Sequence, residues 1–165
     1  TKQVWENILR DDYDNWDVPT LQEEYNAYKQ DNPLPYKELI FPDVLKVLNE
    51  VKSRGLKIGL ASSSVKADIL RALKENHLDG FFDVVLSGEE FKESKPNPEI
   101  YLTALNQLGV KPNQALIIED SEKGIAAGVA AGVEVWAIKD NRFGMDQGAA
   151  KGLLDNLIDV LDLLE

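Results

Sequence analysis

Residues 115–138 read ALIIEDSEKGIAAGVAAGVEVWAI, and their order of residue types decides the fold class. The apolar runs Ala115–Glu119 and Val133–Ile138 have the length of short buried strands. Between them, Gly124–Ala131 is a run of small residues that predicts a helix, with Gly132 closing it. Strand runs without polar alternation, joined by a helix, predict parallel strands of a sheet covered on both faces. Ligands of such sheets bind at the carboxyl ends of the strands.

The same alternation of helix and strand extends through most of the remaining chain. We predict helices over residues 42–54, 65–76, 98–108 and 153–164, strands over 56–61 and 84–87, and helix ends at Gly55 and Gly109. These repeated units predict the α/β fold class with a parallel sheet.

The first 35 residues have a different character. Their apolar residues recur at helical spacing in two segments, which predicts two helices. Thr20, with Glu23 three residues later, predicts a capping box at the start of the second helix. A linker containing two prolines ends at Pro35, so we expect one domain over residues 1–35 and a second over 36–165.

The composition limits the classes of function. The chain has 165 residues, of which 44% are hydrophobic, and this suffices for one domain with a small appendage. It has no cysteine, which excludes disulfides and thiolate metal sites and leads us to expect a cytoplasmic location. No apolar stretch has the length of a membrane span, so no membrane partner is expected. The net charge of −11 opposes nucleic acid as a partner, and any phosphate site must use a few placed lysines, backbone N–H groups and a metal ion.

Polar residues stand at predicted strand ends and loops that an α/β sheet would bring to one crevice. Glu119 and Asp120 follow an apolar run, and paired carboxylates at the mouth of a buried strand favour Mg²⁺, whose ligands are hard oxygens. Ser62 and Ser63 precede a predicted helix, so a hydroxyl and backbone N–H groups could hold a phosphate there. Lys95 lies on a loop stiffened by prolines and could neutralise charge on a phosphoryl oxygen.

Each of these residues also has a purely structural interpretation. Serine and aspartate commonly cap helices, and a single lysine is commonly solvated. The only histidine, His77, stands at the end of a predicted helix and is interpreted as structural, so a serine or cysteine hydrolase triad is poorly supported.

Three segments together resemble the second, third and fourth motifs of the haloacid dehalogenase-like superfamily. They are LASSS over residues 60–64, SKPNPEIY over 94–101 and IEDSEKGIAA over 118–127. The resemblance is closest to the branch that contains β-phosphoglucomutase and small sugar-phosphate phosphatases. It implies a Rossmann-like core, Mg²⁺ as cofactor and hydrolysis of a small phosphate monoester such as a sugar phosphate.

The resemblance also implies a role for each candidate residue. Ser62, with Ser63, would bind the transferring phosphoryl group, and Lys95 would offset charge between nucleophile and phosphate. Asp120, with Glu119, would help to hold Mg²⁺. Residues 1–35 resemble part of the helical cap that closes over the active site in this family.

One motif of the family is not found. Its members use the first aspartate of an Asp-x-Asp motif, at the end of the first strand, as covalent nucleophile. Asp12-Tyr13-Asp14 has this spacing but lies in an acidic helical stretch, and we do not interpret it as the nucleophile. We therefore expect a further segment of roughly 40 to 50 residues that carries the central strand, ahead of Thr1 or as a companion chain.

Two alternatives to a phosphatase stay open. A mutase of the β-phosphoglucomutase type would use the same residues but return the phosphate to another hydroxyl of the sugar. A non-catalytic binding module would keep the fold without the nucleophile.

Overall fold

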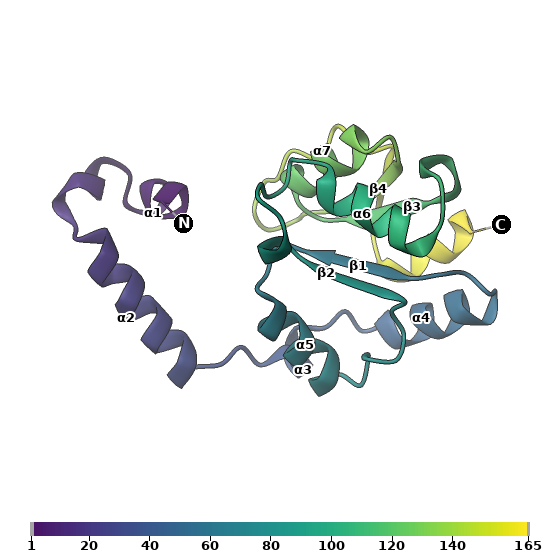
Figure 1. The fold of residues 1–165 in the computed structure, drawn as a ribbon, viewed down its shortest axis with the longest axis horizontal. Coiled ribbons are helices and arrows are strands. Elements are labelled where there is room, and N and C mark those ends of the chain that lie inside the picture. The colour runs from purple at the N-terminus through teal and green to yellow at the C-terminus, as the bar shows by residue number, and fades with distance from the viewer. Residues whose placement is uncertain (1, 165) are drawn as a thin grey trace. The chain divides into compact units, whose positions relative to one another are not determined.

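The computed structural model describes residues 2–164 (Figure 1). Its internal contacts divide the chain into two compact units, Thr1–Pro35 and Tyr36–Glu165. The division falls at the end of the proline-containing linker. Thr1 and Glu165, the outer ends of the two domains expected from the sequence, lie outside the described residues.

The first unit is helical. It contains α1 (Lys2–Leu9), a 3-10 helix (Arg10–Asn15) and α2 (Val18–Asp31). Trp5 of α1 packs edge to face on Tyr25 of α2, with 6.0 Å between the ring centroids. An aromatic contact of this geometry stabilises the pairing of the two helices.

The capping box predicted at Thr20 is wrong. Helix α2 begins at Val18, two residues earlier, and Asp17 is its N-cap residue. Pro19 lies in the first turn, where a missing N–H removes no helical hydrogen bond. The hydroxyl of Thr20 donates to the Asp17 carboxylate at 2.6 Å, so this threonine supports the first turn from inside the helix.

The second unit has the predicted α/β composition. Its helices are α3 (Tyr36–Leu39), α4 (Val44–Ser53), α5 (Lys66–Glu75), α6 (Glu99–Leu108) and α7 (Glu122–Ala130), its strands are β1 (Gly59–Ser62), β2 (Val84–Ser87), β3 (Leu116–Glu119), β4 (Glu134–Ile138) and β5 (Gly152–Leu154), and its 3-10 helices are Gly88–Glu90, Pro112–Gln114 and Leu157–Leu163. Among the described residues of the whole chain, no helix combines the length and apolar character needed to cross a membrane.

All strand pairs are parallel, as the sequence predicts. β1 pairs with β2, and β4 pairs with β3 on one side and β5 on the other. Within residues 2–164, no hydrogen-bonded pairing joins β1 to β3, so each of these two strands has one unpaired edge. The last pairs of the two ladders are Ser62 with Ser87 and Glu119 with Ala137. The candidate site residues therefore lie at the carboxyl ends of β1 and β3.

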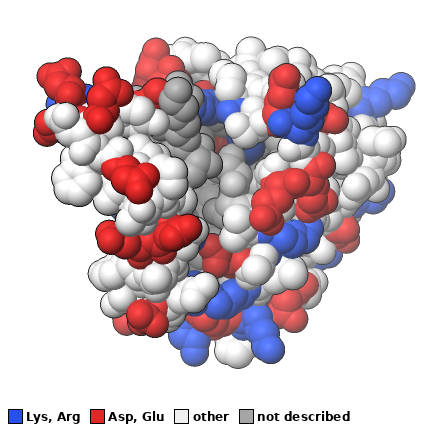
Figure 2. All heavy atoms as spheres, turned by 60° about the vertical axis from the view of Figure 1, so that its left-hand side comes forward, with Lys and Arg blue, Asp and Glu red and all other residues white. Residues whose placement is uncertain are grey.

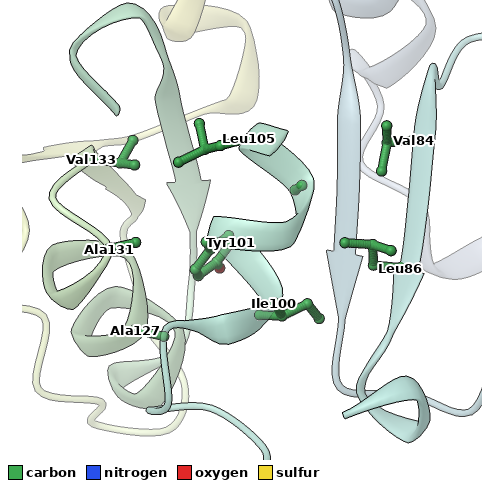
Figure 3. Packing of buried hydrophobic residues seen from close by; sticks show 9 residues of the cluster. Val84, Leu86, Ile100, Tyr101, Leu105, Ala127, Ala131 and Val133 are labelled. Carbon is green, nitrogen blue, oxygen red and sulfur yellow. The ribbon is translucent and has the colours of Figure 1, made fainter. Parts of the chain in front are cut away.

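Helix α6 packs against both groups of strands. Helix α6 contacts β1 and β2 on one side, as Figure 3 shows, and the hydroxyl of its Tyr101 donates to Glu119 of β3. Ile100, Tyr101 and Leu105 of this helix belong to one buried cluster with Val84 and Leu86 of β2. Helix α6 and the loop before it are thus fixed relative to the ends of β1 and β3.

Strand β1 begins at Gly59, three residues later than predicted. The N–H of Ile58 donates to the Asp83 carboxylate at 2.8 Å and not to a strand carbonyl. Gly55 and Gly109, with φ of 72° and 68°, take the left-handed conformation just after α4 and α6, so the two predicted helix ends are confirmed.

The helix predicted over residues 153–164 is wrong. The segment forms the end of β5 and a 3-10 helix. Asn156 precedes the 3-10 helix, and its N–H donates to the Asp159 carboxylate at 2.8 Å. Leu154 and Val160 are both buried, so apolar residues that suggested one amphipathic helix belong to two elements.

Candidate active site

Lys95 lies at the centre of the candidate site. It is only 9% exposed. Its Nζ donates to the carbonyl of Ala61 at 3.0 Å, to the hydroxyl of Tyr101 at 2.9 Å and to Oε1 of Glu119 at 2.5 Å. A lysine ammonium group has three N–H donors, and all three are used here. Because Ala61 lies in β1 and Glu119 ends β3, one buried cation connects two strands that do not pair.

Glu119 is the charged partner of Lys95, and both of its oxygens are occupied. Oε1 accepts from Lys95 and from the Tyr101 hydroxyl, each at 2.5 Å. Oε2 accepts from the N–H of Asp120 at 3.1 Å, and from the N–H and hydroxyl of Ser121 at 3.3 and 3.1 Å. Burial by itself would raise the pKa of Glu119, but the hydrogen bonds from Lys95 and Tyr101 outweigh burial and hold that pKa below its ordinary value. Glu119 is therefore a buried carboxylate that stays charged.

Gly124 makes room for this carboxylate. A Cβ placed on Gly124 would lie 2.0 Å from Cδ of Glu119, far inside van der Waals contact. Gly124 belongs to the first turn of α7, whose N-cap residue Ser121 accepts a hydrogen bond from the Gly124 N–H at 3.1 Å. The N-terminus of a helix also favours a nearby negative charge. The glycine in this segment thus allows Glu119 to lie against the start of α7.

Tyr101 completes the cluster, and apart from its place in segment 94–101 no sequence signal points to its role. Burial and then the adjacent Glu119 charge raise the pKa of the Tyr101 phenol, so it stays neutral and donates to Glu119. The Lys95 ammonium group also lies 4.7 Å from the centroid of the Tyr101 ring, a cation–π contact. Tyr101 therefore contacts both charged members of the pair.

Asp120, the next residue after β3, has different surroundings. It is exposed to solvent. Partial desolvation and the neighbouring Glu119 charge raise the pKa of Asp120 above its ordinary value. Because these surroundings disfavour the negative charge of Asp120, a bound cation would stabilise its carboxylate form.

The available carboxylates limit which metal ion would fit. The described part of the chain contains no group of three or more His, Cys, Asp and Glu side chains that could hold a metal. Mg²⁺ is commonly held by one or two carboxylates, with waters and substrate phosphate completing its shell. Asp120 fits this pattern, whereas Glu119 could reach an ion only by giving up one of its five hydrogen bonds.

The end of β1 is a turn held by the end of β2. Ser62 Oγ accepts from the N–H of Ser64 at 3.1 Å. The fully buried Ser87 donates its hydroxyl to the carbonyl of Ser64 at 2.8 Å. Gly88 approaches so closely that a Cβ there would lie 3.2 Å from Cα of Ser63. These contacts fix the turn and leave Ser63 exposed.

The start of α5 already interacts with a protein carboxylate. The N–H of Lys66, the first residue of the helix, donates to Glu89 at 2.6 Å. A phosphate at this turn could not use that N–H unless Glu89 moved. Ser62 and Ser63 are thus the better placed candidates for phosphate contacts.

The structure brings the predicted residues together only in part. Lys95 and Glu119 are in direct contact, and Ser62 and Asp120 each follow a residue that Lys95 contacts. Asp12-Tyr13-Asp14 lies in the 3-10 helix of the first unit and not at the end of a strand, in agreement with its exclusion as nucleophile.

Comparison with known sequences gives consistent matches. The family model for haloacid dehalogenase-like hydrolases matches residues 1–138. A phosphorylated carbohydrates phosphatase of Thermotoga maritima is 36% identical over 113 residues, which are 66% of this chain and 52% of that protein. Pyrophosphatase PpaX of Bacillus cereus is 30% identical over 162 residues, which are 94% of this chain and 74% of that protein. The chain thus spans about half the length of the first of these relatives.

Solved structures agree with the sequence matches. A candidate beta-phosphoglucomutase from Thermotoga maritima has a TM-score of 0.69 at 32% identity, covering 75% of this chain and 60% of that one. A haloacid dehalogenase-like hydrolase from Bacteroides fragilis has a TM-score of 0.75 at 26% identity, covering 88% and 71%.

Proposed function

This chain belongs to the haloacid dehalogenase-like hydrolases, and on that premise we propose that it takes part in Mg²⁺-dependent hydrolysis of a small phosphate monoester such as a sugar phosphate. The observation that carries the proposal is the ammonium group of Lys95, buried between the ends of β1 and β3. A fixed cation at the carboxyl ends of parallel strands stabilises charge that develops on a phosphoryl group bound there.

Each candidate residue has a specific role in this proposal. Ser62 and Ser63 bind phosphoryl oxygens at the exposed turn after β1. Lys95 offsets the phosphoryl charge, and Glu119 holds Lys95 in position through the 2.5 Å contact. Asp120 is the first choice as metal ligand, with Glu119 second because its oxygens are occupied. Bound Mg²⁺ would neutralise charge on the phosphoryl oxygens.

We place the nucleophile on a segment outside residues 1–165 that forms a strand between β1 and β3. The unpaired edges of these strands support this placement, because one parallel strand could hydrogen-bond to both. Lys95 contacts the ends of β1 and β3, so the last side chain of an interposed strand would lie beside its ammonium group.

The chemistry of that segment would follow covalent catalysis. An aspartate carboxylate attacks phosphorus while the P–O bond to the sugar breaks, and the sugar oxygen takes a proton from a second carboxylic acid of the segment. Water, losing a proton to that same carboxylate, then attacks the phosphorus of the aspartyl-phosphate. This step releases inorganic phosphate and restores both groups.

We assign Thr1–Pro35 to part of a helical cap. This unit is compact through its internal contacts, and a linker with two prolines joins it to the α/β unit. A unit of this kind could close over a bound substrate and exclude water.

We also propose a small substrate and no nucleic-acid partner. The chain has 29 acidic and 18 basic residues. On the face in Figure 2, red Asp and Glu patches recur and the blue Lys and Arg residues are scattered among them. Such a surface repels a polyanion at long range, whereas a single phosphate needs only the local cation Lys95.

The first test is phosphate release from sugar phosphates and pyrophosphate, with Mg²⁺ or with EDTA. Lys95→Met should lower turnover by at least about 100-fold, the usual cost of removing a group that stabilises transition-state charge. Lys92→Met, at an exposed lysine of the same loop, is the matched control and should keep wild-type turnover. Wild-type turnover in Lys95→Met would overturn the proposed role of Lys95 in offsetting the phosphoryl charge. The intact mass of the purified protein would show whether a further segment accompanies residues 1–165.

A phosphomutase is the second candidate, favoured by the match to the candidate beta-phosphoglucomutase at 32% identity. Incubation with β-glucose 1-phosphate distinguishes the two, since a mutase forms glucose 6-phosphate and a phosphatase forms glucose and inorganic phosphate. A non-catalytic module would show no turnover in either the wild type or Asp120→Asn, whereas an enzyme would lose its Mg²⁺-dependent turnover in Asp120→Asn.

A further inference from the structure

Gln147 is one of the few buried polar residues among those that the structure describes, and it lies in the loop between β4 and β5. It is 9% exposed. Its Oε1 accepts from the N–H of Asp140 at 2.9 Å. Its Nε2 donates to the carbonyl of Asp120 at 2.9 Å and to the carbonyl of Ile138 at 2.8 Å. The amide thus uses both of its donors and its acceptor on backbone groups from three different places.

These contacts lie where the pairing of β3 with β4 ends. The last pair of that ladder is Glu119 with Ala137, so Asp120 and Ile138 come directly after it. The side-chain amide of Gln147 bonds to both of their carbonyls. It therefore holds the backbone after β3 next to the backbone after β4, just beyond the last strand pair.

The backbone of Asp120 depends on side chains for its position. Its N–H donates to Oε2 of Glu119 at 3.1 Å, and its carbonyl accepts from Gln147 at 2.9 Å. Glu119 fixes one side of this residue and Gln147 the other. A change in either side chain would shift the peptide that carries the Asp120 carboxylate.

The loop that carries Gln147 has an ordered start. The Asp140 carboxylate accepts from the N–H groups of Met145, Arg142 and Phe143, at 2.8, 2.9 and 3.0 Å. These backbone hydrogen bonds, with that of Met145 largest, lower the pKa of Asp140, so it remains charged at neutral pH. The path from β4 to Gln147 is therefore constrained by hydrogen bonds at both of its ends.

We propose that Gln147 is a positioning residue that sets the affinity of Asp120 for the metal ion, by holding the Asp120 carbonyl. The metal part of this inference rests on the proposed function. The hydrogen bonds of Gln147 to Ile138 and Asp140 would be enough to hold the loop in place. The additional hydrogen bond to the Asp120 carbonyl connects this loop to the candidate site.

The test compares two substitutions with a matched control in the full chain. Gln147→Met keeps the approximate size and removes every hydrogen bond of the amide. Gln147→Glu keeps an acceptor for Asp140 and removes both donors. Gln107→Met, at an exposed glutamine of α6, is the control. Circular dichroism and thermal unfolding establish that each variant is folded.

Two readouts besides turnover are measured. Titration calorimetry with Mg²⁺ should give a dissociation constant about 10-fold or more above wild type in both Gln147 variants, as for other residues that orient metal ligands. The ¹⁵N–¹H signal of Asp120, recorded without metal, should shift in both variants and stay unchanged in Gln107→Met. Turnover at saturating Mg²⁺ should stay within about threefold of wild type, because a weakened metal site is filled at high concentration.

The outcomes separate this inference from the proposed function. A Mg²⁺ dissociation constant within about twofold of wild type in folded Gln147→Glu would overturn the inference while the function stands. An unmoved Asp120 signal in both variants would also overturn it. If wild type itself binds no Mg²⁺, the metal role of Asp120 and the affinity claim both fall, and a shifted Asp120 signal would then support only the positional part. Gln147→Glu decides the matter if Gln147→Met does not fold.

Discussion

At the carboxyl end of β3 the Glu119 side chain is buried and bonded to the side chains of Lys95, Tyr101 and Ser121, whereas at the carboxyl end of β1 Ser62 is half-buried, Ser63 is exposed, and the turn is held mainly by backbone groups. The Glu119 side chain is 9% exposed and accepts five hydrogen bonds. Ser63 is exposed, and Ser62 accepts one bond from the turn. This difference indicates that the buried charges of Lys95 and Glu119 at the β3 end help to stabilise the fold, while the β1 end remains accessible to a ligand. Substitutions at the β3 end should therefore change stability as well as activity, and those at the β1 end mainly phosphate binding.

The largest effect is expected from Glu119→Gln. The substitution keeps the shape but leaves the Lys95 ammonium group buried without its carboxylate, which should lower the free energy of unfolding by about 3 kcal/mol. Urea denaturation measures the change, with Glu122→Gln at an exposed position of the adjacent helix as control. If Glu119→Gln lowers the free energy of unfolding no more than Glu122→Gln does, the buried charge at the β3 end does not stabilise the fold.

The same variant should also change the pH dependence of stability. The pKa of Glu119 is lower in the folded chain than its ordinary value, so its contribution is present above the ordinary glutamate pKa of about 4.3 and is lost as pH falls through the folded value. Wild type should therefore lose more stability than Glu119→Gln between neutral pH and the acid region. Parallel acid profiles for the two proteins would contradict a charged, stabilising Glu119.

Gly124→Ala should have the next largest effect. The added Cβ would overlap the Glu119 carboxyl group, and overpacking of this kind costs about 2 kcal/mol, only partly offset by the better helix propensity of alanine. Gly80→Ala is the control, because a Cβ there meets no atom within 4 Å. Thermal unfolding of the two variants measures the difference, and equal melting temperatures would show that Glu119 can move aside freely.

Tyr101→Phe should have a smaller effect on the same cluster. It removes one hydroxyl that donates to Glu119 and accepts from Lys95, and a single hydrogen bond contributes about 1 kcal/mol, or somewhat more to a charged group. Tyr28→Phe, at a largely exposed tyrosine of α2, should leave stability unchanged. A stability of Tyr101→Phe equal to wild type would indicate that Lys95 and Glu119 do not need the phenol.

The smallest change in stability is expected from Ser62→Ala. It removes the acceptor of one exposed hydrogen bond from Ser64, which should cost under about 1 kcal/mol. The KM for a sugar phosphate should nevertheless rise by about 10-fold, the effect of losing one hydrogen bond to a charged ligand. If stability falls as far as in Glu119→Gln while KM stays constant, the two strand ends do not differ in the proposed way.

The sequence predicts the order and type of most elements because local signals and packing agree in them. Strand β3, helix α7 and strand β4 all lie within two residues of their predicted bounds. The terminal segment differs because its apolar spacing suits a helix, while pairing of Leu153 with Ala137 makes its start a strand. That pairing joins residues far apart in the sequence, and no local pattern in residues 153–164 reports it.

The candidate site shows the same limit. Glu119 could be selected because a carboxylate at the mouth of a buried strand needs compensation, and Lys95 because it lies on a loop stiffened by prolines. Tyr101 and Gln147 could not, because their partners lie 18 and 27 residues away and become neighbours only in the folded chain. The sequence predicts that Gly124 lies in a helix, but not that the Glu119 carboxyl group packs against it, because that contact forms only in the folded chain.

The three hydrogen bonds of Lys95 have a consequence for ligand selectivity. Since its donors are all in use, a phosphoryl oxygen can gain one only by displacing Ala61, Tyr101 or Glu119. A doubly charged oxyanion compensates for the displaced bond through its attraction to the ammonium group, whereas an uncharged analogue of the same shape cannot. Vanadate and sulfate should therefore inhibit competitively, while neutral sugars should bind poorly even where they fit.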